Sequence, residues 1–366
     1  MKKNLFIILF ALASSIVAMG QTYSLRGTVN SGYEGNTIYL ATYNYGKWVK
    51  KDSARITNNK FTFNGTTPSP EVDYLLYDNG DKYLFSDFML ENAIIAMSVT
   101  IGNDLELTAM GTKSNESYAR YKEFMSNYRN NANPVQEQLQ KNQGNKVVTD
   151  SLTQLLYAYG EKLDNQLEQL TQQSNDNYVG LMLLQNFYGR WKIDRTKEYL
   201  SKVPKSLQTT DIYKRISDHV ATLENTCEGK HFVDIQSKTP EGKDIKLSTY
   251  VGKAKVVLVD FWASWCGPCM MEMPNVVKAY NLYKAKGLEI VGVSLDSRIE
   301  SWKKALAEQK MTWPQMSDLK GWKSDMAKAY GVRAIPATVL IDHKGTIIVR
   351  DLRGDELLKK IEELLK

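Results

Sequence analysis

Residues 256–276, VVLVDFWASWCGPCMMEMPNV, decide the fold of the C-terminal part of the chain. The stretch opens with an apolar run that holds one acid, Asp260, as expected of a central strand that is buried on both faces. Gly267 and Pro268 then break the run, and Pro268 suits the first turn of a helix because its missing N–H would have no partner there. The sequence therefore predicts a buried strand that turns into a helix starting at Cys266.

Two of the three cysteines of the chain, Cys266 and Cys269, lie at this predicted helix start. Free N–H groups and the positive end of the helix dipole favour a thiolate at Cys266, and only the thiolate attacks a disulfide. Cys269 follows three residues later on the same helix face, within bonding reach of Cys266. We therefore expect Cys266 to attack a disulfide and Cys269 to resolve the mixed disulfide, which leaves a Cys266–Cys269 disulfide.

Two carboxylates stand on either side of the cysteines. Asp260 lies mid-strand among Val and Phe, where burial should raise its pKa and make it a proton acceptor and donor near neutral pH. Glu272 returns to the helix face that carries Cys269 and is placed to serve the same thiol. One of the two acids must take the proton of Cys269. The plainer interpretations also stand: Asp260 as a buried acid paired with a lysine or water, and Glu272 as a solvated helix acid.

The first twenty residues, MKKNLFIILFALASSIVAMG, have the layout of a secretory signal peptide: two lysines, a short apolar core, then small residues before Gln21. Ala18 and Gly20 hold the −3 and −1 positions of a cut before Gln21. The alternative is an uncleaved membrane anchor, but the apolar stretch is short for a span that needs roughly 20 residues. We expect residues 1–20 to be a cleavable signal peptide that sends the protein to the periplasm or cell envelope.

Length, charge and cysteine content narrow the class of protein. A chain of 366 residues is too long for one ordinary core and suits two or three domains. The net charge of +6 arises from 47 basic and 41 acidic residues spread along the chain, without a dense basic block, so nucleic acid is not an expected partner. Three cysteines are too few for a disulfide scaffold, and a single CxxC in an oxidising compartment is better interpreted as a redox-active pair.

The pattern of apolar residues divides the chain into three parts. Alternating segments such as YSLRGTV, NTIYLATYN, KFTFNGTT and DLELTAM predict a small antiparallel β domain at residues 21–113. Residues 114–227 are predicted to be helical, and the Asn-rich stretch around Pro134 and Gly144 is expected to join two helices. The helical period is clearest where apolar residues recur every three or four positions: Leu152, Leu156, Tyr159, Leu163, Leu167 and Leu170.

From residue 228 onward, strands alternate with helices. Crossovers of this kind predict an α/β sheet with at least some parallel pairing. The expected fold class is therefore multidomain, with an N-terminal antiparallel β domain, a central helical region and a C-terminal α/β domain at residues 228–366.

The C-terminal motifs closely resemble those of thioredoxins. VDFWASWCGPC matches their active-site strand and turn, and GVRAIPAT at 331–338 resembles their cis-proline loop. The resemblance implies a thioredoxin fold, in which Ile335, the residue before Pro336, pairs its backbone with an extended substrate segment beside the cysteines. It also implies that Trp265 belongs to the docking surface. An ordinary trans proline at Pro336 is the alternative.

Within this superfamily the chain is more similar to the exported TlpA/ResA-like thiol–disulfide oxidoreductases. The run from Cys269 through Glu272 to Pro274 fits them, as does the long segment 297–328 before the cis-proline loop. The resemblance implies that Glu272 belongs to the active site, whereas an aspartate at Asp260 is a feature of thioredoxin itself, so the division of labour between the acids stays open. The first two hundred residues resemble only the β domain and helical insert of unknown function that accompany some envelope thioredoxins.

These observations predict a protein-disulfide reductase that needs no cofactor. Its partners would be disulfide-bearing client proteins of the envelope and a membrane thiol carrier that supplies electrons. The Gly-Pro dipeptide of reducing thioredoxins, without a histidine to stabilise the thiolate further, favours reduction over oxidation. The N-terminal half would orient clients or hold the protein as a homodimer. A client-binding module that uses the thioredoxin fold only as a scaffold is a rival, against which the intact WCGPC argues.

Two further rivals concern the cysteines. A thiol peroxidase shares the fold, but its cysteine follows the order PxxxTxxC, and Val259 and Ala263 occupy those places before Cys266. Structural zinc needs about four ligands, and no metal site is predicted because none of the histidines pairs in spacing with the CxxC: His219, His231 and His343. Cys227 is expected to be a free thiol without a role, the alternative being regulation through a disulfide with the CxxC pair.

Overall fold

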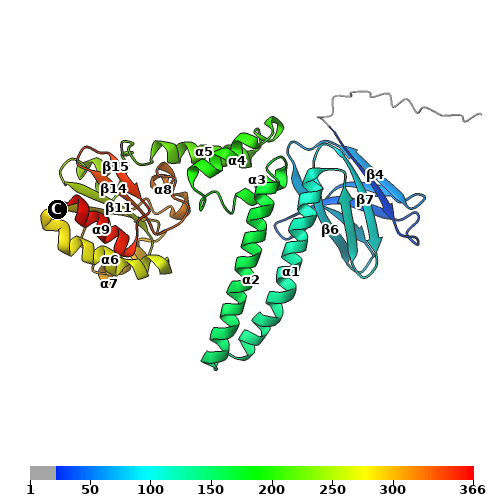
Figure 1. Cartoon of the computed structure of the whole chain (residues 1–366). Coiled ribbons are helices and arrows are strands. Elements are labelled where there is room, and N and C mark those ends of the chain that lie inside the picture. Colours follow the sequence, from blue (N-terminus) through cyan, green and yellow to red (C-terminus); the bar gives the residue numbers. More distant parts are fainter. Residues whose placement is uncertain (1–21) are drawn as a thin grey trace, which may run out of the picture. The chain divides into compact units, whose positions relative to one another are not determined.

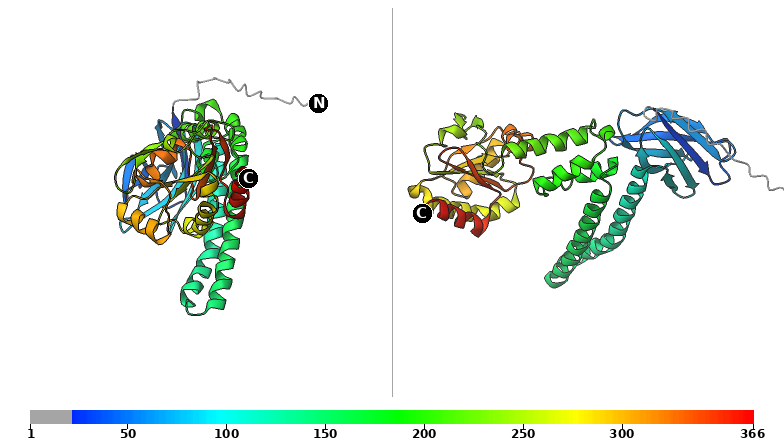
Figure 2. Two further views of the ribbon diagram at one scale, coloured as in Figure 1. Left: turned by 90° about the vertical axis from the view of Figure 1, so that its left-hand side faces the viewer. Right: turned by 45° about the horizontal axis from the view of Figure 1, so that its top comes forward.

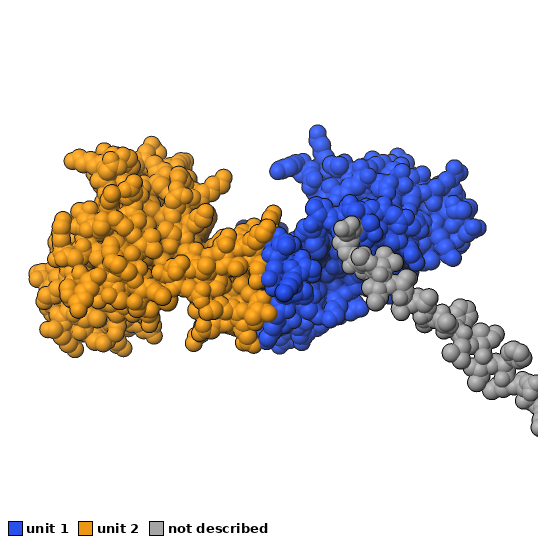
Figure 3. All heavy atoms as spheres, turned by 90° about the horizontal axis from the view of Figure 1, so that it is seen from above, with its two compact units in different colours: residues 1–184, 202–210 blue, residues 185–201, 211–366 orange. Residues whose placement is uncertain are grey.

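A computed structural model describes residues 22–366, which form two compact units. The first unit contains residues up to 184 together with 202–210, and the second contains 185–201 and 211–366 (Figure 3). The chain therefore passes between the units three times. The expected signal peptide at 1–20 lies outside the described residues. Between residues 22 and 366, no helix has the length and apolar character that a bilayer span requires.

Two four-stranded sheets form the β part of the first unit, with strand orders β4-β1-β7-β8 and β3-β2-β5-β6. All pairs are antiparallel except β1 and β7, which run parallel. The strands are β1 (Tyr23–Val29), β2 (Thr37–Asn44), β3 (Lys47–Arg55), β4 (Lys60–Gly65), β5 (Glu71–Asp78), β6 (Tyr83–Leu90), β7 (Ile94–Ile101) and β8 (Leu105–Met110).

The two sheets share one hydrophobic core. Every second residue of β7 is buried, as the period of two along a strand requires. Leu25 and Ile95 enter the core from one sheet, and Leu40 and Leu75 enter it from the other. The alternation seen in the sequence thus produces a sandwich, in agreement with the predicted β domain.

Helices α1 (Lys113–Lys141) and α2 (Lys146–Gln173) follow as an antiparallel pair, which both views of Figure 2 show side by side. The Asn115 side chain fixes the start of α1 on the sandwich, because it exchanges two hydrogen bonds with the backbone of Met89 in β6. The Asn-rich stretch does join two helices, but only around Gly144, where the turn lies at 142–145, because α1 continues through Pro134. The one hydrogen bond that proline removes is outweighed by packing along α2.

The remaining helices before residue 228 are short. They are α3 (Tyr178–Leu184), α4 (Ile193–Lys202) and α5 (Asp211–Asn225). Helix α3 belongs to the first unit, whereas α5 and all of α4 except its last residue belong to the second. The residues expected to form one helical region are therefore shared between both units.

A five-stranded sheet of order β13-β12-β11-β14-β15 forms the centre of the second unit. Strand β11 is buried along its whole length and pairs parallel with β12 and antiparallel with β14, so the predicted central strand and parallel pairing are confirmed. The strands are β11 (Val256–Trp262), β12 (Leu288–Ser294), β13 (Gln315–Met316), β14 (Ala337–Asp342) and β15 (Ile347–Arg350), with a separate hairpin of β9 (Gln236–Lys238) and β10 (Asp244–Lys246).

Helices cover this sheet and complete the thioredoxin-like domain. They are α6 (Gly267–Tyr283), α7 (Ile299–Glu308), α8 (Asp325–Ala329) and α9 (Gly354–Leu364). Helices α6 and α9 lie side by side (Figure 1), and both bury apolar residues such as Val276 and Leu357 in the common core. The multidomain fold class expected from the sequence is confirmed.

Candidate active site

Cys266 caps the N-terminus of α6, where its Sγ accepts a hydrogen bond from the Cys269 amide at 3.1 Å. A disulfide joins the two cysteines. Cys266 is 5% exposed and Cys269 is 1% exposed, so Cys266 is the sulfur that a partner molecule reaches first. The helix start predicted from Gly267 and Pro268 therefore puts Cys266 among free backbone N–H groups, which favour its thiolate.

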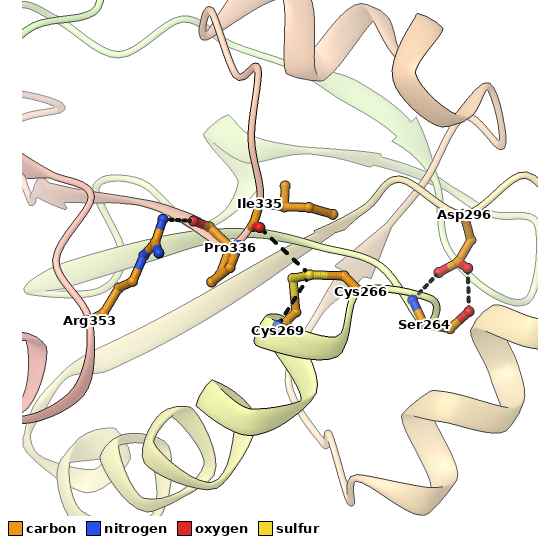
Figure 4. The surroundings of a disulfide bond; sticks show 7 residues. All are labelled: Ser264, Cys266, Cys269, Asp296, Ile335, Pro336 and Arg353. Atoms are coloured by element: carbon orange, nitrogen blue, oxygen red, sulfur yellow. Dashed lines mark hydrogen bonds between the residues drawn. A yellow bond between two sulfur atoms is a disulfide. The ribbon is translucent and has the colours of Figure 1, made fainter. Parts of the chain in front are cut away.

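The cis-proline loop lies directly beside this sulfur. The Ile335–Pro336 peptide bond is cis, and the Ile335 carbonyl oxygen lies 3.7 Å from Cys266 Sγ (Figure 4). Arg353 donates a hydrogen bond of 2.5 Å to the carbonyl of Pro336. The fold thus brings residues almost seventy positions apart to one edge, as the resemblance implied for Ile335 and Pro336.

Two tryptophans give this edge an apolar surface. Trp265 precedes the first cysteine and is 53% exposed, and its ring centroid lies 5.9 Å from that of Trp322, which is 52% exposed. Exposed aromatic pairs of this kind are typical of interaction surfaces. Trp322 was not predicted, because it comes from the long segment 297–328 and no local pattern connects it with the cysteines.

Asp260 lies within β11 and is 2% exposed. Burial, and then the nearby carboxylate of Glu272, raise its pKa to about 7. Its Oδ2 has no hydrogen-bond partner among the described residues, and none of their lysines or arginines pairs with it. The arrangement is that of a buried acid able to exchange a proton near neutral pH.

Glu272 is half-buried and fully engaged by hydrogen bonds. Its Oε1 accepts from the Gly354 amide at 2.6 Å, and its Oε2 accepts from Asn275 Nδ2 at 3.3 Å. Since Gly354 is the first residue of α9, the carboxylate sits where a helix N-terminus favours negative charge. Glu272 is therefore neither simply solvated nor free, and it acts on Asp260 through its charge.

An additional acid, Asp296, supports the turn before the cysteines. Its carboxylate accepts hydrogen bonds from the amide and the hydroxyl of Ser264, at 3.0 and 2.5 Å (Figure 4), and from Ser294 Oγ at 2.8 Å. Sequence reasoning missed this residue. The signal was available, because Asp296 follows a strand parallel to β11, and the carboxyl ends of parallel strands meet at one edge of a sheet.

The other candidates lie apart from the cysteine pair. Cys227 is a free thiol whose Sγ contacts the Glu224 carbonyl at 3.3 Å. His231 Nδ1 lies 2.9 Å from the Gly345 carbonyl oxygen, and His219 is buried beside Tyr188. Within residues 22–366 no three His, Cys, Asp or Glu side chains gather in a way that would hold a metal ion.

Known protein families match the β sandwich and the thioredoxin-like domain. The AhpC/TSA family matches residues 229–350, and a domain of unknown function, DUF4369, matches residues 23–118.

The relatives that match the C-terminal part include two from Bacillus species. The thiol-disulfide oxidoreductase ResA of Bacillus thuringiensis subsp. konkukian is 35% identical over 126 residues, which cover 34% of this chain and 69% of that protein. The thioredoxin-like protein YneN of Bacillus subtilis is 35% identical over 136 residues, covering 36% and 75%. Among solved structures, the thioredoxin domain of a thiol-disulfide oxidoreductase from Bacteroides vulgatus is 36% identical, covering 38% of this chain and 99% of that one, with a TM-score of 0.36.

Proposed function

Because the chain belongs to the family of ResA-like thiol-disulfide oxidoreductases, we propose that it is exported and reduces disulfide bonds of client proteins in the cell envelope. The observation that carries this proposal is the position of Cys266. Its sulfur lies at the start of α6, 3.7 Å from the Ile335 carbonyl oxygen and next to the exposed Trp265. An extended client segment that pairs with Ile335 presents its own disulfide to that sulfur.

The first step is attack by the Cys266 thiolate on one sulfur of the client disulfide. A mixed disulfide forms between Cys266 and the client, and the other client sulfur leaves as a thiolate that takes a proton from water. The exposed pair of Trp265 and Trp322 covers the client segment on one side of the reacting sulfurs, and the cis-proline loop aligns it on the other.

The second step releases the client. Asp260 accepts the proton of the Cys269 thiol, and the resulting thiolate attacks Cys266 Sγ, so that the second client sulfur leaves with both electrons of the mixed disulfide. The client gains two thiols, and the protein is left with its Cys266–Cys269 disulfide. We assign the base to Asp260 because its pKa of about 7 suits a proton acceptor at neutral pH, whereas both oxygens of Glu272 already accept hydrogen bonds.

Turnover then requires a two-electron thiol donor. For an exported protein we propose a membrane thiol carrier, with export directed by residues 1–20. The Gly267-Pro268 pair between the cysteines supports a reducing role, since the known range runs from roughly −270 mV for thioredoxin to about −120 mV for the oxidant DsbA.

The test is a redox equilibrium with glutathione, combined with insulin reduction driven by dithiothreitol. The wild-type chain without residues 1–20 should reduce insulin and show a potential near the thioredoxin end of the range. The Cys266→Ser variant should have no activity above dithiothreitol alone. A potential near the DsbA end would reverse the direction proposed, and insulin reduction by Cys266→Ser equal to that of the wild type would refute it.

A further inference from the structure

Two cavities in the second unit border residues 331–333, the segment that leads into the cis-proline loop. His219 and Arg333 line both cavities. The smaller cavity, of about 400 Å³, is also lined by Tyr188, Lys192, Arg350, Asp351 and Arg353. The larger, of about 560 Å³, is also lined by Trp322, by three lysines and by two carboxylates: Lys214, Lys323, Lys328, Asp211 and Asp218. Trp322, which lines the larger cavity, also packs against Trp265 beside Cys266.

Positive charge in the smaller cavity is not matched by carboxylates. Among the described residues that line it, four cations face one acid, Asp351, which forms an ion pair with none of them. Arg350 donates to the carbonyl and hydroxyl of Thr226 and to the Tyr330 carbonyl, all of which are neutral acceptors. Within residues 22–366, the hydrogen-bond acceptor of Arg353 is the Pro336 carbonyl, which is also neutral.

Arg333 has still fewer contacts. Its guanidinium lies 5.4 Å from the Tyr188 ring centroid, and it has no ion pair or hydrogen bond with another side chain of residues 22–366. Guanidinium groups bind carboxylates through paired, charge-assisted hydrogen bonds. Arg333 is therefore the residue best placed to bind an anion that enters from outside.

His219 is a buried, neutral wall of both cavities. It is 6% exposed, its ring packs edge-on against Tyr188 at 4.9 Å, and its Nε2 has no hydrogen-bond partner among the described residues. Burial, with Arg333 and Arg350 nearby, lowers the pKa of His219 to about 4, so the ring is neutral at pH 7. A buried polar atom of this kind is costly without a partner. The neutral ring leaves the positive charge of the smaller cavity to its arginines and Lys192.

The geometry points to a binding site for a carboxylate side chain of the client. We propose that the smaller cavity selects client segments that carry Asp or Glu near the attacked cysteine. The inference rests on the proposed function. Ala334 and Ala337, on either side of Ile335 and Pro336, also line the cavity. Figure 4 shows Arg353 at the Pro336 carbonyl and the Ile335 carbonyl beside the disulfide. Because an extended segment advances about 3.3 Å per residue and the cavity borders both sides of the cis-proline, we place the acid within a few residues of the client cysteine.

The experiment compares pairs of disulfide-bonded peptides that differ only in Glu or Gln at positions within four residues of one cysteine. Reduction by the dithiol form of the protein gives kcat/KM for each peptide. We expect the best-placed Glu to raise kcat/KM about tenfold over its Gln counterpart, an advantage that falls with added salt. Arg333→Gln should reduce this ratio to about one or two. The matched control is Lys344→Gln, which removes an exposed cation from the turn between β14 and β15 and should keep the wild-type ratio.

The outcomes separate the two proposals. If neither peptide is reduced, the proposed function itself fails. If both are reduced at the same rate at every position, or if Arg333→Gln keeps the full ratio, the carboxylate site is refuted while the reductase stands. A titration with inorganic phosphate covers a free anion as the occupant. Arg333-dependent phosphate binding together with equal peptide rates would assign the cavity to a small anion and overturn client selection.

Discussion

The carboxylate of Glu272 accepts a hydrogen bond from the backbone amide of Gly354 at 2.6 Å, so the acid nearest the cysteines in sequence also holds the start of α9. The preceding residue, Arg353, donates to the carbonyl of Pro336. Two neighbouring positions thus connect the helix that carries Cys269 with the cis-proline loop. The cis-proline loop is therefore positioned in part from the helix that carries the disulfide.

Glu272→Gln should lower the free energy of unfolding by about 1 kcal/mol at pH 7, because a charge-assisted hydrogen bond at a helix N-terminus becomes a neutral one. It should also lower the pKa of Asp260, since the Glu272 charge is one cause of its elevation. Urea unfolding measures the first effect, and NMR titration of the Asp260 carboxyl measures the second. Glu356→Gln is the control, because Glu356 is an exposed acid in the first turn of α9, the turn that Glu272 contacts through Gly354. Equal effects of the two variants would contradict the specific role of Glu272.

The pH dependence of stability should report on Asp260. Its folded pKa of about 7 lies above its ordinary value of 3.8, so between these values the folded protein holds a proton that the unfolded chain has lost. The contribution of this group is fully present below about pH 4 and is lost as the pH rises through about 7.

Asp260→Asn should therefore raise the free energy of unfolding of the disulfide form at pH 8, by at most on the order of 4 kcal/mol, with the gain vanishing near pH 4. Urea unfolding of wild type and variant from pH 4 to pH 8 measures the difference. A gain independent of pH would show that Asp260 does not titrate as described.

The same variant should slow release of the client from the mixed disulfide about a hundredfold at pH 7, as expected for loss of a general base.

The two cysteines should fail in different ways when replaced. Cys269→Ser keeps the attacking sulfur but cannot resolve, so it should accumulate mixed disulfides with proteins of the envelope, which mass spectrometry of affinity-purified material identifies. Cys266→Ser should accumulate none. Consumption of hydrogen peroxide at the wild-type rate by a Cys269→Ala variant would instead support a peroxidase, in which the single cysteine suffices.

A fragment of residues 229–366 should be less stable than one of residues 211–366. The longer fragment keeps α5, whose C-terminal neighbour Thr226 accepts two hydrogen bonds from Arg350, and whose Leu223 lies against Gly331. Loss of the bonds at Thr226 alone should lower the free energy of unfolding, measured in urea, by about 1–3 kcal/mol.

Both fragments should reduce insulin, yet capture fewer clients than the full chain when each carries Cys269→Ser. Equal capture by all three would remove any role of the first unit in client choice.

Local signals in the sequence were sufficient for the centre of the site. An apolar run with one acid predicts a buried β11 and a raised pKa for Asp260, and Gly267 with Pro268 predicts the helix start at Cys266. These features depend on residues adjacent in the chain. The position of Ile335 beside Cys266 came from the resemblance to a family, because nothing local to residue 335 indicates which distant segment it meets.

The residues that sequence reasoning missed act across long separations. Trp322 and Arg353 contact Trp265 and Pro336 through bends of the chain that only the folded sheet defines, whereas the place of Asp296 beside Ser264 follows from the parallel pairing of two predicted strands. Pro134 shows the opposite error, since a local helix-breaking signal was overridden by packing of α1 along α2.

The chain passes between its two units three times, which restricts how recombination can separate the units during evolution. A domain attached by one linker can be gained, lost or exchanged by a single recombination event. Here residues 202–210 belong to the first unit but lie between segments of the second, so no single crossover in the gene separates the units cleanly. The two units are therefore expected to descend together as one evolutionary module.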